Sequence, residues 1–235
     1  MFSYGAYGSG KNFTIFGPDD PALPEAWFKW PKPHDLWGIF PRVAYDLFEM
    51  SDQTWKFSMK YFQNIGDEIL DLMSPTKETK NSKIGLQKDY ADFNDISWCT
   101  TATLKSWSEL CDTFEKADAR KVTSPTPDSR QSIRGHRILT LEVSKPKDDE
   151  PQIRQQGRIY ICDLACPENV HNLFYANYKK TKHSDGTAEY KLVGPHKNQK
   201  LTRNLQEQSE NIIWSLGELG HFFRTMAQWV KKKKR

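Results

Sequence analysis

The stretch Met1-Phe-Ser-Tyr-Gly-Ala-Tyr-Gly-Ser-Gly-Lys-Asn12 carries the pattern G-x-x-x-x-G-K-[ST] with its last position changed. In this pattern glycines let the backbone wrap a phosphate with its N–H groups, and the lysine reaches the outer phosphates. We therefore expect a nucleotide to bind the following residues: Gly5, Ala6, Tyr7, Gly8, Ser9, Gly10, Lys11 and Asn12.

The last position of the pattern normally supplies a hydroxyl group to Mg²⁺, and Asn12 offers a neutral amide oxygen instead. This change predicts nucleotide binding with less efficient hydrolysis. The four residues Met1 to Tyr4 are too few for the complete strand that normally precedes such a loop. We therefore expect the chain to begin inside a fold.

The composition indicates one polar domain. The chain has 235 residues, 37% of them hydrophobic, and a mean hydropathy of −0.76. No apolar run approaches the roughly 20 residues that a membrane span needs, and no signal peptide opens the chain, so we expect a cytoplasmic or nuclear protein without a membrane partner. The cysteines, Cys99, Cys111, Cys162 and Cys166, form no C-x-x-C pair and are expected to be free thiols.

Hydrophobic periodicity predicts alternating strands and helices, and so an α/β fold. Strands are expected where apolar and polar residues alternate, at Phe57 to Tyr61, Ile138 to Val143 and Ile159 to Cys162. Two helices are expected from apolar stripes, which we interpret as core. The first stripe is Leu104, Trp107, Leu110, Cys111 and Phe114, with Ser106 or Ser108 as cap, and the second is Ile212, Leu216, Leu219, Phe223 and Met226.

Three stretches are expected to be loops. Gly17 to Gly38 is rich in proline and tryptophan, and its aromatic residues either anchor the loop to its own domain, which we favour, or bind a partner. Lys145 to Pro151 is expected to be a charged hairpin turn. His171 to Arg203 is long and basic. It suits an acidic filament or a nucleic acid.

The net charge of +4 is concentrated in the tail Lys231 to Arg235. This tail either binds an acidic polymer, a filament or a nucleic acid, acts as a nuclear import signal, or is a solvated helix end.

The chain resembles the kinesin motor domain. The segment FSYGAYGSGKNFTIFG, followed by GIFPR, is similar to kinesin FAYGQTGSGKT(Y/F)TM and GIIPR. WKFSMKYFQNIGDEILDLMSP resembles the kinesin strand, "EIYNE" turn and "DLL" helix, and GRIYICDLACPE resembles the strand that ends in DLAGSE. DSRQSIRGH is similar to switch I, N-x-x-S-S-R-S-H, and ENIIWSLGELGHFF to the switch II helix motif INKSLxxLG. These landmarks occur in family order.

The resemblance implies roles for switch residues. Arg134 would form the salt bridge to Glu168 that closes the pocket around the γ-phosphate, and Asp163 would orient magnesium through water. Two substitutions affect the same chemistry. Ile133 has no oxygen for the metal, and Cys166 replaces the glycine that approaches the γ-phosphate. The expected catalytic residues are thus Arg134, Asp163 and Glu168, and the expected metal residues are Asn12 and Asp163.

The resemblance therefore implies a partial kinesin-type P-loop NTPase fold over residues 1–230, with a mixed central sheet flanked by helices and a basic tail at 231–235. It implies ATP or ADP with Mg²⁺ as cofactors, microtubules (tubulin) as partner in preference to nucleic acid, and a place in the cytoplasm on the cytoskeleton. The function would be microtubule-based movement with impaired hydrolysis. The alternative is an inactive pseudo-motor that binds microtubules or scaffolds a partner.

A complete kinesin motor also has opening strands that this chain lacks. We expect either a truncated gene model or a sheet completed by a partner.

Overall fold

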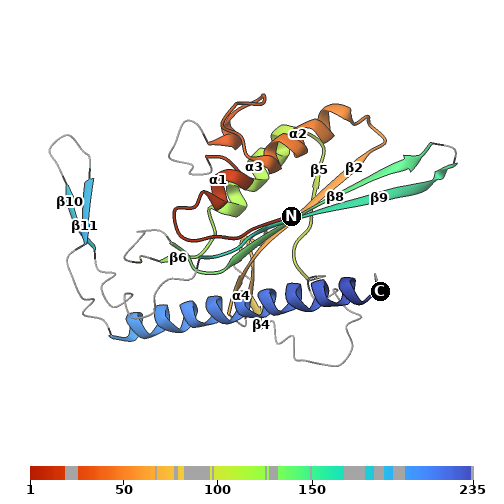
Figure 1. Cartoon of the computed structure of the whole chain (residues 1–235). Coiled ribbons are helices and arrows are strands. Elements are labelled where there is room, and N and C mark those ends of the chain that lie inside the picture. The colour runs from red at the N-terminus through yellow and green to blue at the C-terminus, as the bar shows by residue number, and fades with distance from the viewer. Residues whose placement is uncertain are drawn as a thin grey trace. The chain divides into compact units, whose positions relative to one another are not determined.

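The computed structural model describes residues 1–18, 26–66, 68–76, 79–81, 96, 98–124, 126, 132–148, 150–166, 178–182, 188–192 and 199–233 (Figure 1). The chain divides into two compact units. Unit 1 comprises Met1–Val122 and His136–Leu164, and unit 2 comprises Thr123–Gly135 and Ala165–Arg235.

Unit 1 contains a 7-stranded mixed sheet. Its strand order is β1-β9-β8-β2-β3-β4, and β5 pairs with β2 beside β3. Only the β1–β9 pair among the described strands of this sheet is parallel. The bounds are β1 Phe2–Ser3, β2 Lys56–Ile65, β3 Glu68–Asp71, β4 Thr79–Asn81, β5 Ala102–Leu104, β8 His136–Lys147 and β9 Glu150–Asp163. The sheet confirms the predicted mixed α/β architecture.

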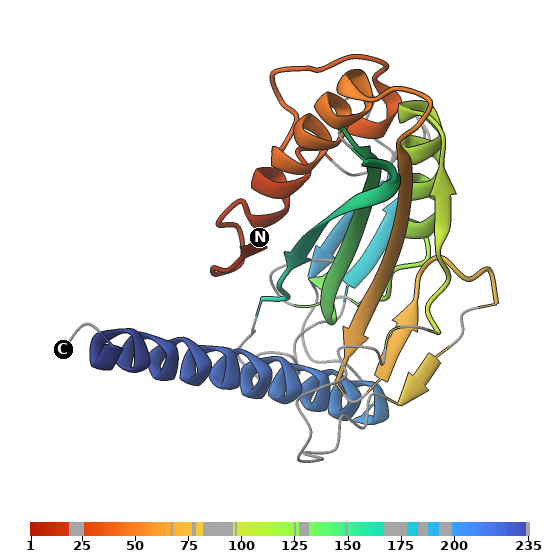
Figure 2. The same cartoon turned by 90° about the vertical axis from the view of Figure 1, so that its right-hand side faces the viewer.

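One face of the sheet forms the core with three helices and a 3₁₀ turn, which Figures 1 and 2 show gathered on the same side. In register, Met59 lies opposite Leu141 and Tyr61 opposite Leu139, and all four side chains are fully buried. This is the face that the alternation in the sequence predicted. The covering elements are α1 Lys11–Ile15, η1 Trp27–Lys29, α2 Ile39–Met50 and α3 Trp107–Asp118.

The described part of the proline- and tryptophan-rich loop is anchored to its own unit, as we favoured. Trp27 is fully buried, and its ring centroid lies 4.7 Å from that of Phe114 on α3 and 5.8 Å from that of Phe40 on α2. Trp37 is also buried, 5.1 Å from the ring of Trp107. The aromatic side chains therefore belong to the core.

Helix α3 begins later than the apolar stripe suggested. Ser106 has extended backbone, and its hydroxyl accepts a hydrogen bond from Glu109 N at 3.2 Å, which caps the helix. The prediction of a serine cap is confirmed for Ser106. Leu104 was wrongly assigned to the helix, because it lies in β5 and is buried from there. Leu104 in β5 and the apolar residues of α3 are buried in the same core, so in the sequence they look like the apolar stripe of a single helix.

The expected helix at Asp71-Leu-Met is replaced by the end of a strand. Asp71 closes β3, and its two carboxylate oxygens accept hydrogen bonds from Met73 N at 2.8 Å and Thr100 N at 2.7 Å. A short acidic side chain that captures nearby backbone N–H groups favours a turn over a helix.

Unit 2 contains the hairpins β6 Thr123–Ser124 with β7 Ser132–Ile133 and β10 Tyr178–Lys182 with β11 Ala188–Leu192, and the helix α4 Gln199–Lys233. The interpretation of residues 171–203 as a loop is wrong for the hairpin and for the start of α4. Residues 171–177, 183–187 and 193–198 lie outside the described residues.

Helix α4 is only partly a core helix. Ile212 is 3% exposed, as predicted, but Phe223 and Met226 are 41% and 44% exposed, so the core interpretation is wrong for them. The 35 residues of α4 span about 50 Å, and the exposed Phe222, Phe223 and Met226 lie toward its carboxyl end. It runs to Lys233, so the start of the basic tail is helical.

Within the described residues, Cys99, Cys111, Cys162 and Cys166 form no disulfide bond. Within the described residues we find no helix whose length and apolar character suit a membrane span.

Candidate nucleotide-binding site

The phosphate-loop motif lies between β1 and α1. β1 runs parallel to β9, with Phe2 opposite Cys162 and Ser3 opposite Asp163. Parallel strands present their carboxyl ends at one edge of a sheet, so the loop after Ser3 and the residues after Asp163 leave the sheet at the same edge. Sequence positions some 160 residues apart are thereby neighbours.

The loop has the backbone that its glycines predicted. Gly8 and Gly10 have φ values of 74° and 81°, in the left-handed region that side chains disfavour. Ser9 N donates to Ala6 O at 3.2 Å and closes the turn. Residues Ala6 to Gly10 are exposed, so their backbone is accessible to a ligand.

Lys11 holds the loop together. Its Nζ donates hydrogen bonds to Gly5 O at 2.8 Å and to Ala6 O at 2.9 Å. The ammonium group therefore lies against the backbone of the loop, where it adds positive charge to the site. A phosphate that approaches the loop would meet this charge together with backbone N–H groups. Asn12 is half-buried in the first turn of α1.

Asp163 is almost completely buried and takes part in an ion-pair cluster. Its Oδ2 accepts hydrogen bonds from Arg137 Nε at 3.0 Å and Arg137 Nη2 at 2.7 Å, and its Oδ1 accepts one from Ser3 Oγ at 3.2 Å. Arg137 lies directly opposite Asp163 in the β8–β9 register. A bidentate guanidinium–carboxylate pair is among the stronger polar contacts in proteins.

The same arginine binds a second carboxylate. Arg137 Nη1 donates to Asp118 Oδ1 at 2.9 Å, and Tyr61 Oη donates to the same oxygen at 2.8 Å. Lys121 forms an ion pair with the other oxygen of Asp118. Burial raises the pKa of Asp118, but the charges of Arg137 and Lys121 outweigh that effect and hold the pKa below its ordinary value. We call Arg137, Asp118, Asp163 and Lys121 the arginine cluster.

His136 precedes this arginine at the start of β8. Burial lowers its pKa, and the charge of Asp163 only partly opposes that shift. A neutral imidazole beside the cluster adds no further cation to it.

The predicted magnesium residues fit the metal poorly. Asn12 supplies an uncharged oxygen, and Asp163 already has its charge balanced by Arg137. Mg²⁺ in proteins is usually held through carboxylates and phosphate oxygens, which here would leave the phosphates to supply most of the charge.

The predicted switch bridge cannot be followed across both partners, because Glu168 lies outside the described residues. Arg134, in unit 2, is fully buried against α4. Its Nη2 donates to Ser209 Oγ at 2.5 Å and to Leu205 O at 3.2 Å, and its Nε donates to Gln208 Oε1 at 3.2 Å. The salt bridge stays a prediction, and the described contacts join switch I to the α4 helix.

Arg137 and Asp118 were missed from the sequence. A signal was present for Arg137, since it continues the inward face of β8, where Leu139 and Leu141 are fully buried. A cation at such a position requires a buried counter-charge. Asp118 gave no signal, because an acid at the end of an amphipathic helix is commonly exposed.

The comparisons with known proteins agree on one family. The family model described as Kinesin motor domain matches residues 1–188. Kinesin heavy chain isoform 5C of Homo sapiens is 28% identical over 177 residues, which cover 72% of this chain and 16% of that protein. Kinesin-like protein KIF22 of Xenopus tropicalis is 25% identical over 179 residues, covering 72% and 25%.

Solved structures of KIF14 show a similar fold. The KIF14 dimer in its two-heads-bound state, with AMP-PNP in complex with a microtubule, has a TM-score of 0.59 at 20% identity and covers 93% of this chain and 52% of that chain. KIF14 with ADP on a microtubule has a TM-score of 0.53 at 21% identity, covering 87% and 50%. The chain thus spans about half the length of these structures and less of the curated relatives. On this evidence the chain belongs to the kinesin motor domain family.

Proposed function

We propose that the chain is a kinesin-type head that binds ADP or ATP through Gly5 to Asn12, binds microtubules, and turns ATP over slowly or not at all. The observation that carries the proposal is the loop itself: Gly8 and Gly10 in left-handed backbone, with the Lys11 ammonium against the loop carbonyls. These groups suit a polyphosphate. The place of action would be the cytoplasm, on the cytoskeleton, as for the family.

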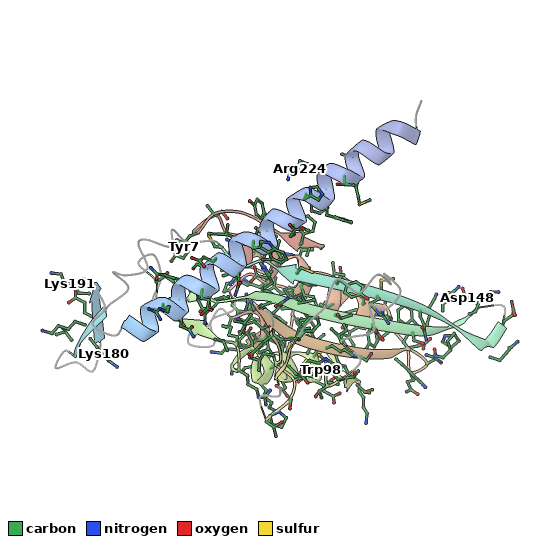
Figure 3. The ribbon with its side chains drawn as sticks, turned by 90° about the horizontal axis from the view of Figure 1, so that it is seen from below. Tyr7, Trp98, Asp148, Lys180, Lys191 and Arg224 are labelled. Atoms are coloured by element: carbon green, nitrogen blue, oxygen red, sulfur yellow. The ribbon has the colours of Figure 1, made fainter. Side chains whose placement is uncertain are left out.

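Microtubule binding is supported by the similar KIF14 structures, which are complexes with microtubules. It is also supported by charge. The β10–β11 hairpin carries the exposed lysines Lys179, Lys180 and Lys191, together with Glu189. Figure 3 labels Lys180 and Lys191, whose side chains project from this hairpin. A basic hairpin suits the acidic surface of a filament.

Slow turnover is supported by the substitutions at Asn12, Ile133 and Cys166. Phosphoryl transfer depends on positioning and charge stabilisation, so changes at the metal and at both switches act on the same step. The proposal has two forms. In one the chain is a slow motor head, and in the other it is a pseudo-motor that stays on microtubules without turnover.

The test is phosphate release by the purified chain with and without microtubules, combined with co-sedimentation in ATP and in ADP. Stimulated phosphate release and nucleotide-dependent detachment would support the slow motor. Saturable co-sedimentation that is the same in ATP and in ADP, without phosphate release, would support the pseudo-motor. The Lys11→Ala variant should lose nucleotide binding and keep its fold, because among the described residues the Lys11 ammonium group donates its hydrogen bonds to the loop carbonyls of Gly5 and Ala6.

The hairpin can be tested by charge reversal. Changing Lys179, Lys180 and Lys191 to glutamate should weaken co-sedimentation, and the loss should grow smaller at high salt because screening weakens the native attraction. A control reverses Lys145 and Lys147 on the β8–β9 hairpin, which are partly exposed and form ion pairs with Asp148 and Glu150. Equal effects of the two sets would refute a specific role for the β10–β11 hairpin. Binding to RNA in place of microtubules would refute the tubulin assignment.

A further inference from the structure

Asp163 has little capacity left for a metal-bound water. A carboxylate offers about four acceptor positions in all. In Asp163 three hydrogen bonds are already present, two from Arg137 to Oδ2 and one from Ser3 to Oδ1. One acceptor position, on Oδ1, remains for a water bound to magnesium, because the guanidinium group of Arg137 holds both positions on Oδ2.

Other contacts hold the guanidinium group of Arg137 in its position beside Asp163. Its side chain is fully buried, and a second carboxylate, Asp118, accepts a hydrogen bond from Nη1 at 2.9 Å. Its guanidinium carbon also lies 5.2 Å from the centre of the Phe16 ring, at the end of α1. Contacts from β9, α3 and the end of α1 therefore fix one orientation of the side chain.

The charges of the arginine cluster already balance. Arg137 and Lys121 supply two positive charges, and Asp118 and Asp163 supply two negative charges. An arginine does not lose its proton in a protein. A divalent cation near Asp163 would therefore add two positive charges beside a permanent one, with no free carboxylate of the cluster to offset them.

We infer that Arg137 takes the place of the divalent cation at Asp163, and that this chain binds its nucleotide without magnesium. The inference rests on the proposed nucleotide binding. On this inference Asp163 belongs to a structural ion pair. Arg137 is a positioning residue, because it fixes the carboxylate of Asp163. The nucleotide phosphates are then neutralised by Lys11 and the loop N–H groups.

The test compares binding of a fluorescent ADP analogue in excess Mg²⁺ and in EDTA, with Mn²⁺ binding followed by electron paramagnetic resonance. For the unmodified chain we expect the two affinities to agree within about twofold and no immobilised Mn²⁺ in the presence of ADP. Affinity that falls about tenfold or more in EDTA, or immobilised Mn²⁺, would overturn the inference. No binding in either buffer would overturn the proposed function and this inference with it.

Two variants sharpen the test. Asp163→Asn keeps the shape of the side chain and removes its charge. If Asp163 orients a metal, this variant loses affinity in Mg²⁺ only, whereas we expect no difference between Mg²⁺ and EDTA. Arg137→Ala frees Asp163, so any folded fraction should gain Mg²⁺-dependent binding, and its failure to do so would overturn the inference. Should Arg137→Ala not fold, the unmodified chain and Asp163→Asn still decide. Arg158→Ala, an exposed arginine on the same sheet, is the control and should behave as the unmodified chain.

Discussion

Replacing Arg137 by alanine should destabilise unit 1 more than any surface change. The side chain is fully buried, and its guanidinium binds Asp118 at 2.9 Å and Asp163 at 2.7 Å. The two aspartates are 2% and 3% exposed, so solvent cannot replace the lost contacts. Lys121 remains beside Asp118, whereas the Oδ2 of Asp163 loses both of the donors described for it.

The magnitude follows from the burial of these charges. Removing one partner of a buried ion pair costs about 3–5 kcal/mol, because the other charge stays behind without compensation. Arg137 serves two carboxylates, so we expect a loss in the upper half of that range. Domains are stable by only about 5–15 kcal/mol, and the change would consume a large part of that margin.

The assay is urea unfolding followed by circular dichroism, with Arg158→Ala as the matched control. Arg158 pairs with Glu142 at 2.5 Å, but its side chain is 51% exposed, so its removal should cost only about 0–1 kcal/mol. Removing these three charges together, as Arg137→Met, Asp118→Asn and Asp163→Asn, should restore most of the loss, because no buried carboxylate is then left unpaired, and the remaining charge, on Lys121, is 21% exposed and can be solvated.

Losses for Arg137→Ala and Arg158→Ala that agree within about 1 kcal/mol would refute the reasoning, since a buried and an exposed pair would then contribute alike. A triple variant less stable than Arg137→Ala would do the same.

Three further predictions concern the core, the thiols and acid stability. Trp27→Ala should lower the free energy of unfolding by about 3–5 kcal/mol, because the ring is fully buried among aromatic side chains, and urea unfolding would reveal it. Burial raises the pKa of Cys111 to about 12, so at pH 8 this thiol should resist alkylation, measured by mass spectrometry, until the chain unfolds. The pKa of Asp118 is lower in the folded chain, which therefore binds fewer protons than the unfolded chain in acid. Stability should accordingly be complete above pH of about 4 and decline as pH falls further, and an Asp118→Asn variant should show a flatter decline in acid titrations.

Local signals predicted the elements well where neighbouring residues carried the information. The alternation of β2 and β8 and the serine cap at Ser106 depend on short-range geometry, and the structure confirms them. The left-handed backbone of Gly8 and Gly10 is likewise local. Local signals failed where distant partners compete. Asp71 captures the backbone of Thr100 and ends a strand where a helix was expected, and Leu104 joins the α3 core from β5.

The sequence by itself determined the family, through motifs whose order and spacing survive substitution. It also determined the glycine-rich turn before α1, because the glycine requirement is local. Only the tertiary structure decided what Asp163 does. Its partner Arg137 lies 26 positions away in the chain, and Asp118 lies a further 19 positions from Arg137. The register of β8 against β9 and the packing of α3 bring these charges together. Electrostatic balance between buried groups depends on that proximity, which no local pattern encodes.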